Sequence, residues 1–174
     1  QTFLPLTFSS ISAPVPYHIQ EGDLEVCLDS MEQIFDEHRG LLAGIIVEPL
    51  VQGAGGMIMH PRGFLKGIEQ LALKYDILFI VDEVMTGLGR TGRMWACQHE
   101  EVSPEILCTA KGLTGGYLPL AATLTTEKIY EAFLGDYTQL KTFFHGHTYT
   151  GNQLGASVAL ANLSLLKEPS FFLV

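Results

Sequence analysis

Three short apolar runs constrain the fold of this chain more than any other feature. They are AGIIVEP (43–49), DILFIVDE (76–83) and EILCTAKG (105–112). Each run is apolar on both faces and too short for a buried helix, which is typical of strands in a parallel sheet covered on each side. A segment with helical spacing, GFLKGIEQLALKY (63–75), separates the first two runs, so the sequence predicts a βαβ unit with a right-handed crossover.

The segment from 24 to 38 predicts a helix, because its apolar residues recur at three- and four-residue spacing. These residues are Leu24, Cys27, Leu28, Met31, Ile34 and Phe35. Asp23 suits the N-cap of this helix, and Gly40 suits its stop.

Three more elements follow the third apolar run. Residues 119–126 predict a fourth strand, and residues 127–134 predict a short helix. Residues 152–167 predict a last helix with one apolar face, formed by Leu154, Val158, Ala161 and Leu165. Together these elements predict an α/β fold, with a mostly parallel sheet and flanking helices.

Composition narrows the class of function. Ten Lys and Arg residues against nineteen Asp and Glu residues give a net charge of −9, which argues against binding to a nucleic-acid backbone. No apolar run reaches the ~18 residues of a membrane span. Only 17% of the residues are charged, against roughly 25% in an average domain. This composition is typical of a chain whose surface is normally covered by another domain or subunit. The three scattered cysteines predict free thiols in a reducing compartment.

Polar residues follow the apolar runs where each run ends. The first run ends at Glu48, the second at Asp82 and Glu83, and the third continues into Lys111. Glycine-rich loops come next: GAGG, TGLGRTG and GLTGG. Ligands of open α/β sheets bind at the carboxyl ends of the strands, so we expect these residues to face one crevice.

Lys111 and Asp82 suit one particular chemistry. A lysine at a strand end can act as an amine nucleophile that forms a Schiff base. Pyridoxal phosphate enzymes need such a lysine, together with an acid that faces the pyridine nitrogen. From spacing alone, Lys111 could equally be a solvated loop residue, and Asp82 a helix cap or a surface carboxylate.

Four motifs in the same order resemble those of class III aminotransferases, which are fold-type I pyridoxal phosphate enzymes. VDEVMTGLGRTG (81–92) is followed, 29 residues after Asp82, by Lys111 in CTAKGLTGG. VEPLVQGAGGM and FFHGHTYTGN fit the same family. The AKGLTGGYLPLAATLTT and HGHTYTGN runs are most similar to members that make 7,8-diaminononanoate in biotin biosynthesis, with S-adenosylmethionine as amino donor and 8-amino-7-oxononanoate as acceptor.

The resemblance implies a role for each matched residue. Lys111 would carry the cofactor as a Schiff base and then move a proton as general base and acid. Asp82 would pair with the pyridinium nitrogen, and Val84 would pack against one face of the ring. Thr148 would donate its hydroxyl to the cofactor phosphate across the interface of a homodimer.

Other matched residues have less specific implied roles. Gln52 and Glu48 lie near the cofactor in the family, and Gly115 and Gly116 would let the backbone pass close to the cofactor or the partner subunit. Plainer interpretations stay open: Glu48 could close a buried ion pair, Val84 could be core, and Thr148 a turn residue.

The resemblance also indicates which parts of the family's two domains residues 1–174 include. Family members are more than twice as long, so we expect part of the large domain, without the upstream phosphate-binding segment and the C-terminal small domain. The family implies a cytoplasmic enzyme, or one of the mitochondrial matrix in a eukaryote. No metal site is expected, because Cys97 with His99 and His145 with His147 fit no standard zinc spacing.

Two alternatives to that function stay open. The chain could come from another class III enzyme that acts on an ω-amine such as ornithine or 4-aminobutyrate. It could instead be a non-catalytic remnant that serves as a structural or interaction domain. In either enzyme the partners would be a small amino donor and a keto acceptor.

Overall fold

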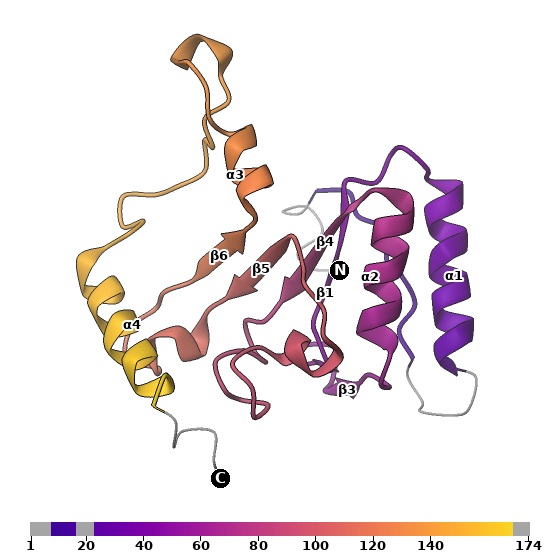
Figure 1. Ribbon diagram of the computed structural model, residues 1–174, viewed down its shortest axis with the longest axis horizontal. Coiled ribbons are helices and arrows are strands. Elements are labelled where there is room, and N and C mark those ends of the chain that lie inside the picture. Colours follow the sequence, from indigo (N-terminus) through magenta and orange to yellow (C-terminus); the bar gives the residue numbers. More distant parts are fainter. Residues whose placement is uncertain (1–7, 17–22, 169–174) are drawn as a thin grey trace.

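The computed structural model describes residues 8–16 and 23–168, and its centre is a four-stranded sheet (Figure 1). The strands follow the order β1-β4-β5-β6. Their bounds are Gly44–Val47 for β1, Leu78–Asp82 for β4, Ile106–Thr109 for β5 and Ala122–Thr125 for β6. β4 runs parallel to β1 and to β5, whereas β6 runs antiparallel to β5. The predicted α/β fold with a mostly parallel sheet is therefore confirmed.

Two helices cover one face of this sheet. α2 (Phe64–Tyr75) packs on β4, and α1 (Asp23–Glu37) packs on α2 (Figure 1). The core between them buries large apolar side chains from both helices and from the sheet: Met31, Phe35, Phe64, Leu65, Ile68, Phe79 and Val81. Burying a side chain of this size contributes about 1.5–3 kcal/mol, so this layer provides much of the stability. The predicted helix over 24–38 and its buried face are confirmed.

The other face of the sheet is open in the described part of the chain. Ile46 is 61% exposed, and Ile80 and Ile106, which lie at the same level of the sheet, are only half-buried. The expectation of a sheet covered on each side is wrong for these residues. In the described part of the chain, α4 (Gln153–Leu166) packs against residues 111–114.

The buried face of α4 also differs from the prediction. Leu154 and Leu165 were expected to face the core, but they are 75% and 63% exposed. The helix instead buries Gly155, Ala159 and Leu166. Since α4 is apolar nearly all round, its periodicity does not distinguish the side that packs.

Short elements appear where the sequence predicted loops or strand ends. β2 (Val51–Gln52) and β3 (Ile58–Met59) form a small antiparallel hairpin after β1. Three 3-10 helices follow later in the chain: η2 (Ala96–Glu100), η3 (Lys111–Thr114) and η4 (Tyr137–Gln139). The third apolar run is therefore a strand only to Thr109. The short helix predicted over 127–134 is α3 (Glu127–Ala132), two residues shorter than expected. No described helix is both long and apolar enough to cross a membrane.

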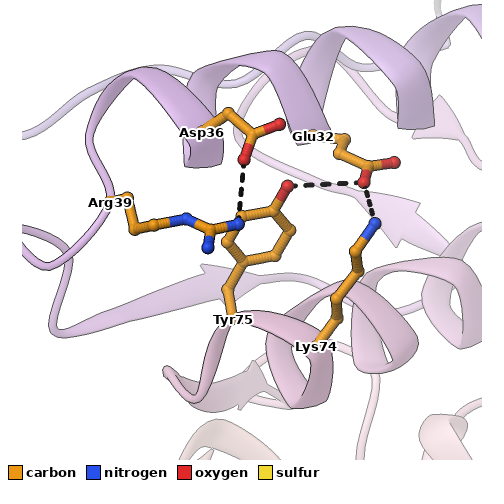
Figure 2. Close-up of polar contacts among 5 residues, drawn as sticks. All are labelled: Glu32, Asp36, Arg39, Lys74 and Tyr75. Carbon is orange, nitrogen blue, oxygen red and sulfur yellow. Dashed lines mark hydrogen bonds and ion pairs between the residues drawn. The ribbon is translucent and has the colours of Figure 1, made fainter.

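A polar cluster links α1 and α2 near their C-terminal ends (Figure 2). Glu32 accepts from the Lys74 ammonium and, at 3.3 Å, from the Tyr75 hydroxyl. Asp36 pairs with Arg39 at 3.1 Å, and the Arg39 guanidinium lies 5.1 Å from the centre of the Tyr75 ring. These ion pairs are largely exposed, so each contributes only about 0–1 kcal/mol. The cluster therefore orients the two helices more than it stabilises them.

Candidate active site

Three residues of the predicted site lie at one edge of the sheet, because β1, β4 and β5 are parallel. Glu48 directly follows β1, whose last residue is level with Val81. Asp82 ends β4, level with Cys108 in β5. Lys111 comes two residues after the end of β5. The structure thus brings Glu48, Asp82 and Lys111 to the carboxyl ends of three neighbouring strands, where ligands of such sheets bind.

A cavity of about 790 Å³ runs along β1 and reaches this edge. Glu48, Gln52, His60 and Asp82 line it. The buried Oε1 of Gln52 and both ring nitrogens of His60 have no hydrogen-bond partner among the described residues. A buried polar atom without a partner costs about 1–3 kcal/mol, so these atoms are suited to meet a ligand. Burial also lowers the pKa of His60, which favours the neutral ring.

The carboxylate of Asp82 is held in place by the backbone that follows it. Its Oδ1 accepts a hydrogen bond at 2.9 Å from the amide of Val84, two residues ahead. Such a bond fixes the side chain relative to the chain turn. Among the described residues Oδ2 accepts no hydrogen bond, so one carboxylate oxygen stays available. Val84 itself is half-buried beside this turn.

Glu48 is half-buried and accepts a hydrogen bond at 2.9 Å from the Gly53 amide. It forms no ion pair within the described ranges, so the ion-pair interpretation does not apply to them. Its bond instead shapes the turn that leads to Gln52 and the hairpin of β2 and β3.

Lys111 begins a 3-10 helix in an unusual conformation. Its φ is 44°, in the left-handed region that non-glycine residues rarely adopt. Such strain costs about 1–3 kcal/mol and occurs often at functional sites. Leu88, in the loop after β4, has a φ of 59° and packs with Leu113, the residue two positions after Lys111. The loop after β4 and the turn after β5 are therefore packed together.

Gly115 and Gly116 close this turn with φ values of 60° and 86°. Left-handed φ favours glycine at both positions. A Cβ on Gly115 would lie 3.1 Å from Oδ1 of Asn162 in α4, so the close approach in the structure is to a helix of the same chain.

Thr148 is not brought to the cavity. It is exposed in the segment between η4 and α4, together with His145 and His147. Cys97, by contrast, is buried in η2. Across the ranges that the structure describes, no group of three or more His, Cys, Asp or Glu residues is placed to hold a metal ion.

Glu83 was expected to face the crevice with Asp82, but it is a buried carboxylate with partners inside its own loop. Its Oε1 accepts from the Cys97 amide at 2.8 Å, and its Oε2 accepts from the Thr86 hydroxyl at 2.7 Å. Successive strand residues point to opposite faces, so Asp82 and Glu83 could not both face one crevice. Because Asp82 faces the crevice, this alternation could have predicted from the sequence that Glu83 points into the protein and has a structural role.

Asn162 was also missed as a residue of this region. Its side-chain amide donates to the carbonyl oxygens of Gly112 at 2.7 Å and Leu113 at 3.3 Å. The sequence held one signal, an amide side chain in the middle of a mostly apolar helix.

Comparisons with known proteins agree with the order of these motifs. The chain is 57% identical, over 94% of its length, to the adenosylmethionine-8-amino-7-oxononanoate aminotransferase of Anoxybacillus flavithermus, of which it covers 37%. The crystal structure of the enzyme of that name from Methanocaldococcus jannaschii matches with a TM-score of 0.87 and 44% identity, over 98% of this chain and 39% of that one.

A more distant match is an ornithine aminotransferase from Toxoplasma gondii, whose structure reveals partial occupancy of PLP at its active site. It matches with a TM-score of 0.72 and 35% identity, over 82% of this chain and 31% of that one. The chain thus spans less than two-fifths of each of these three proteins. The family model for class III aminotransferases matches residues 1–173. The chain therefore belongs to the class III aminotransferase family.

Proposed function

We propose that residues 1–174 are part of the large domain of a pyridoxal phosphate-dependent aminotransferase that makes 7,8-diaminononanoate for biotin biosynthesis. The amino donor would be S-adenosylmethionine and the acceptor 8-amino-7-oxononanoate. The observation that carries the proposal is that Asp82 ends β4 and Lys111 closely follows the parallel neighbour β5, at one sheet edge. The 57% identity to the Anoxybacillus relative supports the choice of substrates.

The residues at this edge fit the chemistry of pyridoxal phosphate. Lys111 supplies an amine, Asp82 supplies a carboxylate with Oδ2 available, and Gln52 supplies a buried carboxamide whose Oε1 has no described partner. The amine matches the aldehyde of pyridoxal phosphate, the carboxylate matches its ring nitrogen, and the carboxamide oxygen matches its ring hydroxyl. Glu48 lines the same cavity as Gln52 and would help to shape it.

When bound, pyridoxal phosphate supplies an aldehyde that condenses with amines and a pyridine ring that takes up an electron pair. Nζ of Lys111 would hold the aldehyde carbon and later accept and return a proton. Oδ2 of Asp82 would keep a proton on the ring nitrogen, because an adjacent anion favours the protonated form. Val84 would pack against one face of the ring.

The remaining parts of the site would come from outside residues 1–174. The open sheet face and the exposed segment before α4 support this, because they leave large apolar side chains uncovered. In that segment these are Tyr137, Leu140, Phe143, Phe144 and Tyr149. We propose that a second copy of the chain covers them in a homodimer, and that Thr148 meets the cofactor phosphate of that copy. The upstream phosphate-binding segment and the small domain would complete the enzyme, which we expect in the cytoplasm.

The test uses the complete enzyme with pyridoxal phosphate. We expect an absorbance band near the visible edge that Lys111→Ala removes and Lys128→Ala, an exposed lysine in α3, leaves unchanged. A wild-type enzyme without the band would refute the cofactor assignment and favour a non-catalytic domain. A band that survives Lys111→Ala would show that another amine reacts.

Substrate identity needs a separate measurement. Loss of the band on addition of S-adenosylmethionine, and its return with 8-amino-7-oxononanoate, would support the proposed pair of substrates. The second candidate is an ornithine aminotransferase, which the match to the Toxoplasma gondii structure favours at a lower identity of 35%. A response to ornithine and none to S-adenosylmethionine would select that candidate.

A further inference from the structure

Asn162 connects α4 to the turn that carries Lys111. Its Nδ2 donates to the carbonyl oxygens of the two residues that follow Lys111, Gly112 at 2.7 Å and Leu113 at 3.3 Å. Asn162 lies 50 positions after Gly112 and 49 after Leu113, so these bonds join two distant segments. No other described side chain donates a hydrogen bond to this pair of carbonyls.

The contact requires a hydrogen-bond donor from the side chain of residue 162. Both partners are carbonyl oxygens, which only accept hydrogen bonds, so the NH2 end of the side chain must face them. The Gly112 oxygen also accepts from the Gly115 amide at 3.0 Å, and its two lone pairs are therefore both used. An aspartate at position 162 has nearly the same shape but offers only acceptors.

The turn that Asn162 holds is strained. Lys111 has a φ of 44°, and a non-glycine residue keeps such a conformation only where its surroundings enforce it. On one side, a Cβ on Gly112 would lie 3.3 Å from Cβ of Leu88, so the loop after β4 contacts the turn closely. On the other side, Asn162 makes its two hydrogen bonds to the turn. Leu113 is buried in a cluster with Leu88 of that loop and Ala159 of α4.

We propose that Asn162 is a positioning residue for Lys111. Its two hydrogen bonds hold the left-handed turn and thereby set the direction in which the lysine amine leaves the backbone. This inference rests on the proposed role of Lys111 as the reactive amine. It gives α4, which contributes none of the matched site residues, a part in the chemistry.

The main test compares Asn162→Asp with Asn152→Asp in the complete enzyme. Asn152 caps α4 by accepting from the Gly155 amide at 2.7 Å, a role that aspartate also fills. The Asn152 amide also donates to the Tyr149 carbonyl at 3.3 Å, but this contact is exposed and water can replace it. The two variants therefore make the same chemical change at one helix, but only the first removes a donor from partly buried carbonyls. With pyridoxal phosphate and borohydride, we expect Lys111 to be trapped at least about tenfold more slowly in Asn162→Asp. The pH midpoint of the absorbance band should shift in the same variant, and Asn152→Asp should stay within about twofold of wild type.

A second readout needs no cofactor. Hydrogen exchange of the peptide over 110–118 reports the turn, whereas the peptide over 153–166 reports α4 itself. In Asn162→Asp the turn amides, including Leu113 and Gly115, should exchange faster while α4 exchanges as in wild type. Equal exchange of the turn in both variants would overturn the positioning role, whatever the cofactor does. Faster exchange in both peptides would mean that Asn162 only stabilises α4.

The two proposals fail in different ways. If the wild-type enzyme traps no adduct at Lys111, the proposed function is wrong, and the hydrogen exchange still decides whether Asn162 holds the turn. If wild type and Asn162→Asp trap Lys111 equally fast, the positioning role is wrong and the function stands. Should Asn162→Asp not fold, Asn162→Leu removes the donors without burying a charge, and the same outcomes apply to it.

Discussion

The buried carboxylate of Glu83 accepts a hydrogen bond at 2.8 Å from the backbone amide of Cys97, 14 residues further along the chain. Its second oxygen accepts from the Thr86 hydroxyl at 2.7 Å. This single side chain therefore closes the loop between β4 and η2, which follows Asp82 and contains Val84. The shape of that loop decides where the Asp82 carboxylate lies.

Replacing Glu83 should destabilise the protein strongly. Glu83→Ala would leave the Cys97 amide and the Thr86 hydroxyl buried without acceptors, at a cost of about 2–4 kcal/mol in the free energy of unfolding. Urea unfolding measures this loss. Glu37→Ala, which changes an exposed residue at the end of α1, should stay within about 0.5 kcal/mol of wild type. Equal stability of the two variants would contradict a structural role of Glu83.

Cys97 should make stability depend on pH in the alkaline range. Burial, followed by the negative charge of Glu83, raises the pKa of the Cys97 thiol from 9.0 to about 12. The folded state therefore holds this proton where the unfolded state has lost it, so stability is full below pH 9 and falls as the pH rises from about 9 to 12. Unfolding experiments over this range should show a smaller decline for Cys97→Ala. An identical decline would mean that other groups cause it.

His60 should have the opposite effect on the acid side. Burial lowers the pKa of this ring below its ordinary 6.5, so the unfolded state takes up a proton at a pH where the folded state does not. Stability should then fall as the pH drops below 6.5. NMR titration should show His60 protonating at a pH below the ordinary 6.5 of a histidine ring. A His60 midpoint at or above 6.5 would refute this environment.

Glu100 should act as a remote cap of α2. Its two carboxylate oxygens accept from the Gly63 and Lys66 amides, each at 3.0 Å, and these amides have no partner within the first turn of a helix. We expect Glu100→Ala to lower the free energy of unfolding by about 1–2 kcal/mol and to speed hydrogen exchange at both amides. Glu100→Gln, which keeps one acceptor oxygen, should lose less. If the exchange of both amides is unchanged, another group caps this helix.

The layers of the fold could be predicted because local pattern and burial agree there. The 3.6-residue spacing of α1 predicted its buried side correctly, since that helix has a polar face to contrast with the apolar one. α4 lacks this contrast, so Leu154 and Leu165 were assigned to the wrong side. The hairpin of β2 and β3 pairs only two residues on each strand, too few for an alternation to be visible.

The candidate site could be predicted only where residues follow strands. Glu48, Asp82 and Lys111 share an edge because parallel strands place their carboxyl ends together. The roles of Glu83 and Asn162 depend on contacts over 14 and 50 positions of sequence, which no local pattern encodes. The roles of Lys111, Asp82 and Glu48, like those of Val84, Gln52 and Thr148, stay predictions, because they concern a ligand and a second copy of the chain.

The pairing of Asp82 with Cys108 has a consequence for how this protein can fail. A slip of β5 by one residue would carry Lys111 about 3.3 Å along the sheet and reverse the face of every side chain in the strand. Such a misfolded form could retain most of its secondary structure and pass a test of helix and strand content. Under the proposed function it would lack activity, because Lys111 would no longer lie at its place relative to Asp82. A lysine-dependent absorbance band would detect such a slip, whereas a measurement of helix and strand content would not.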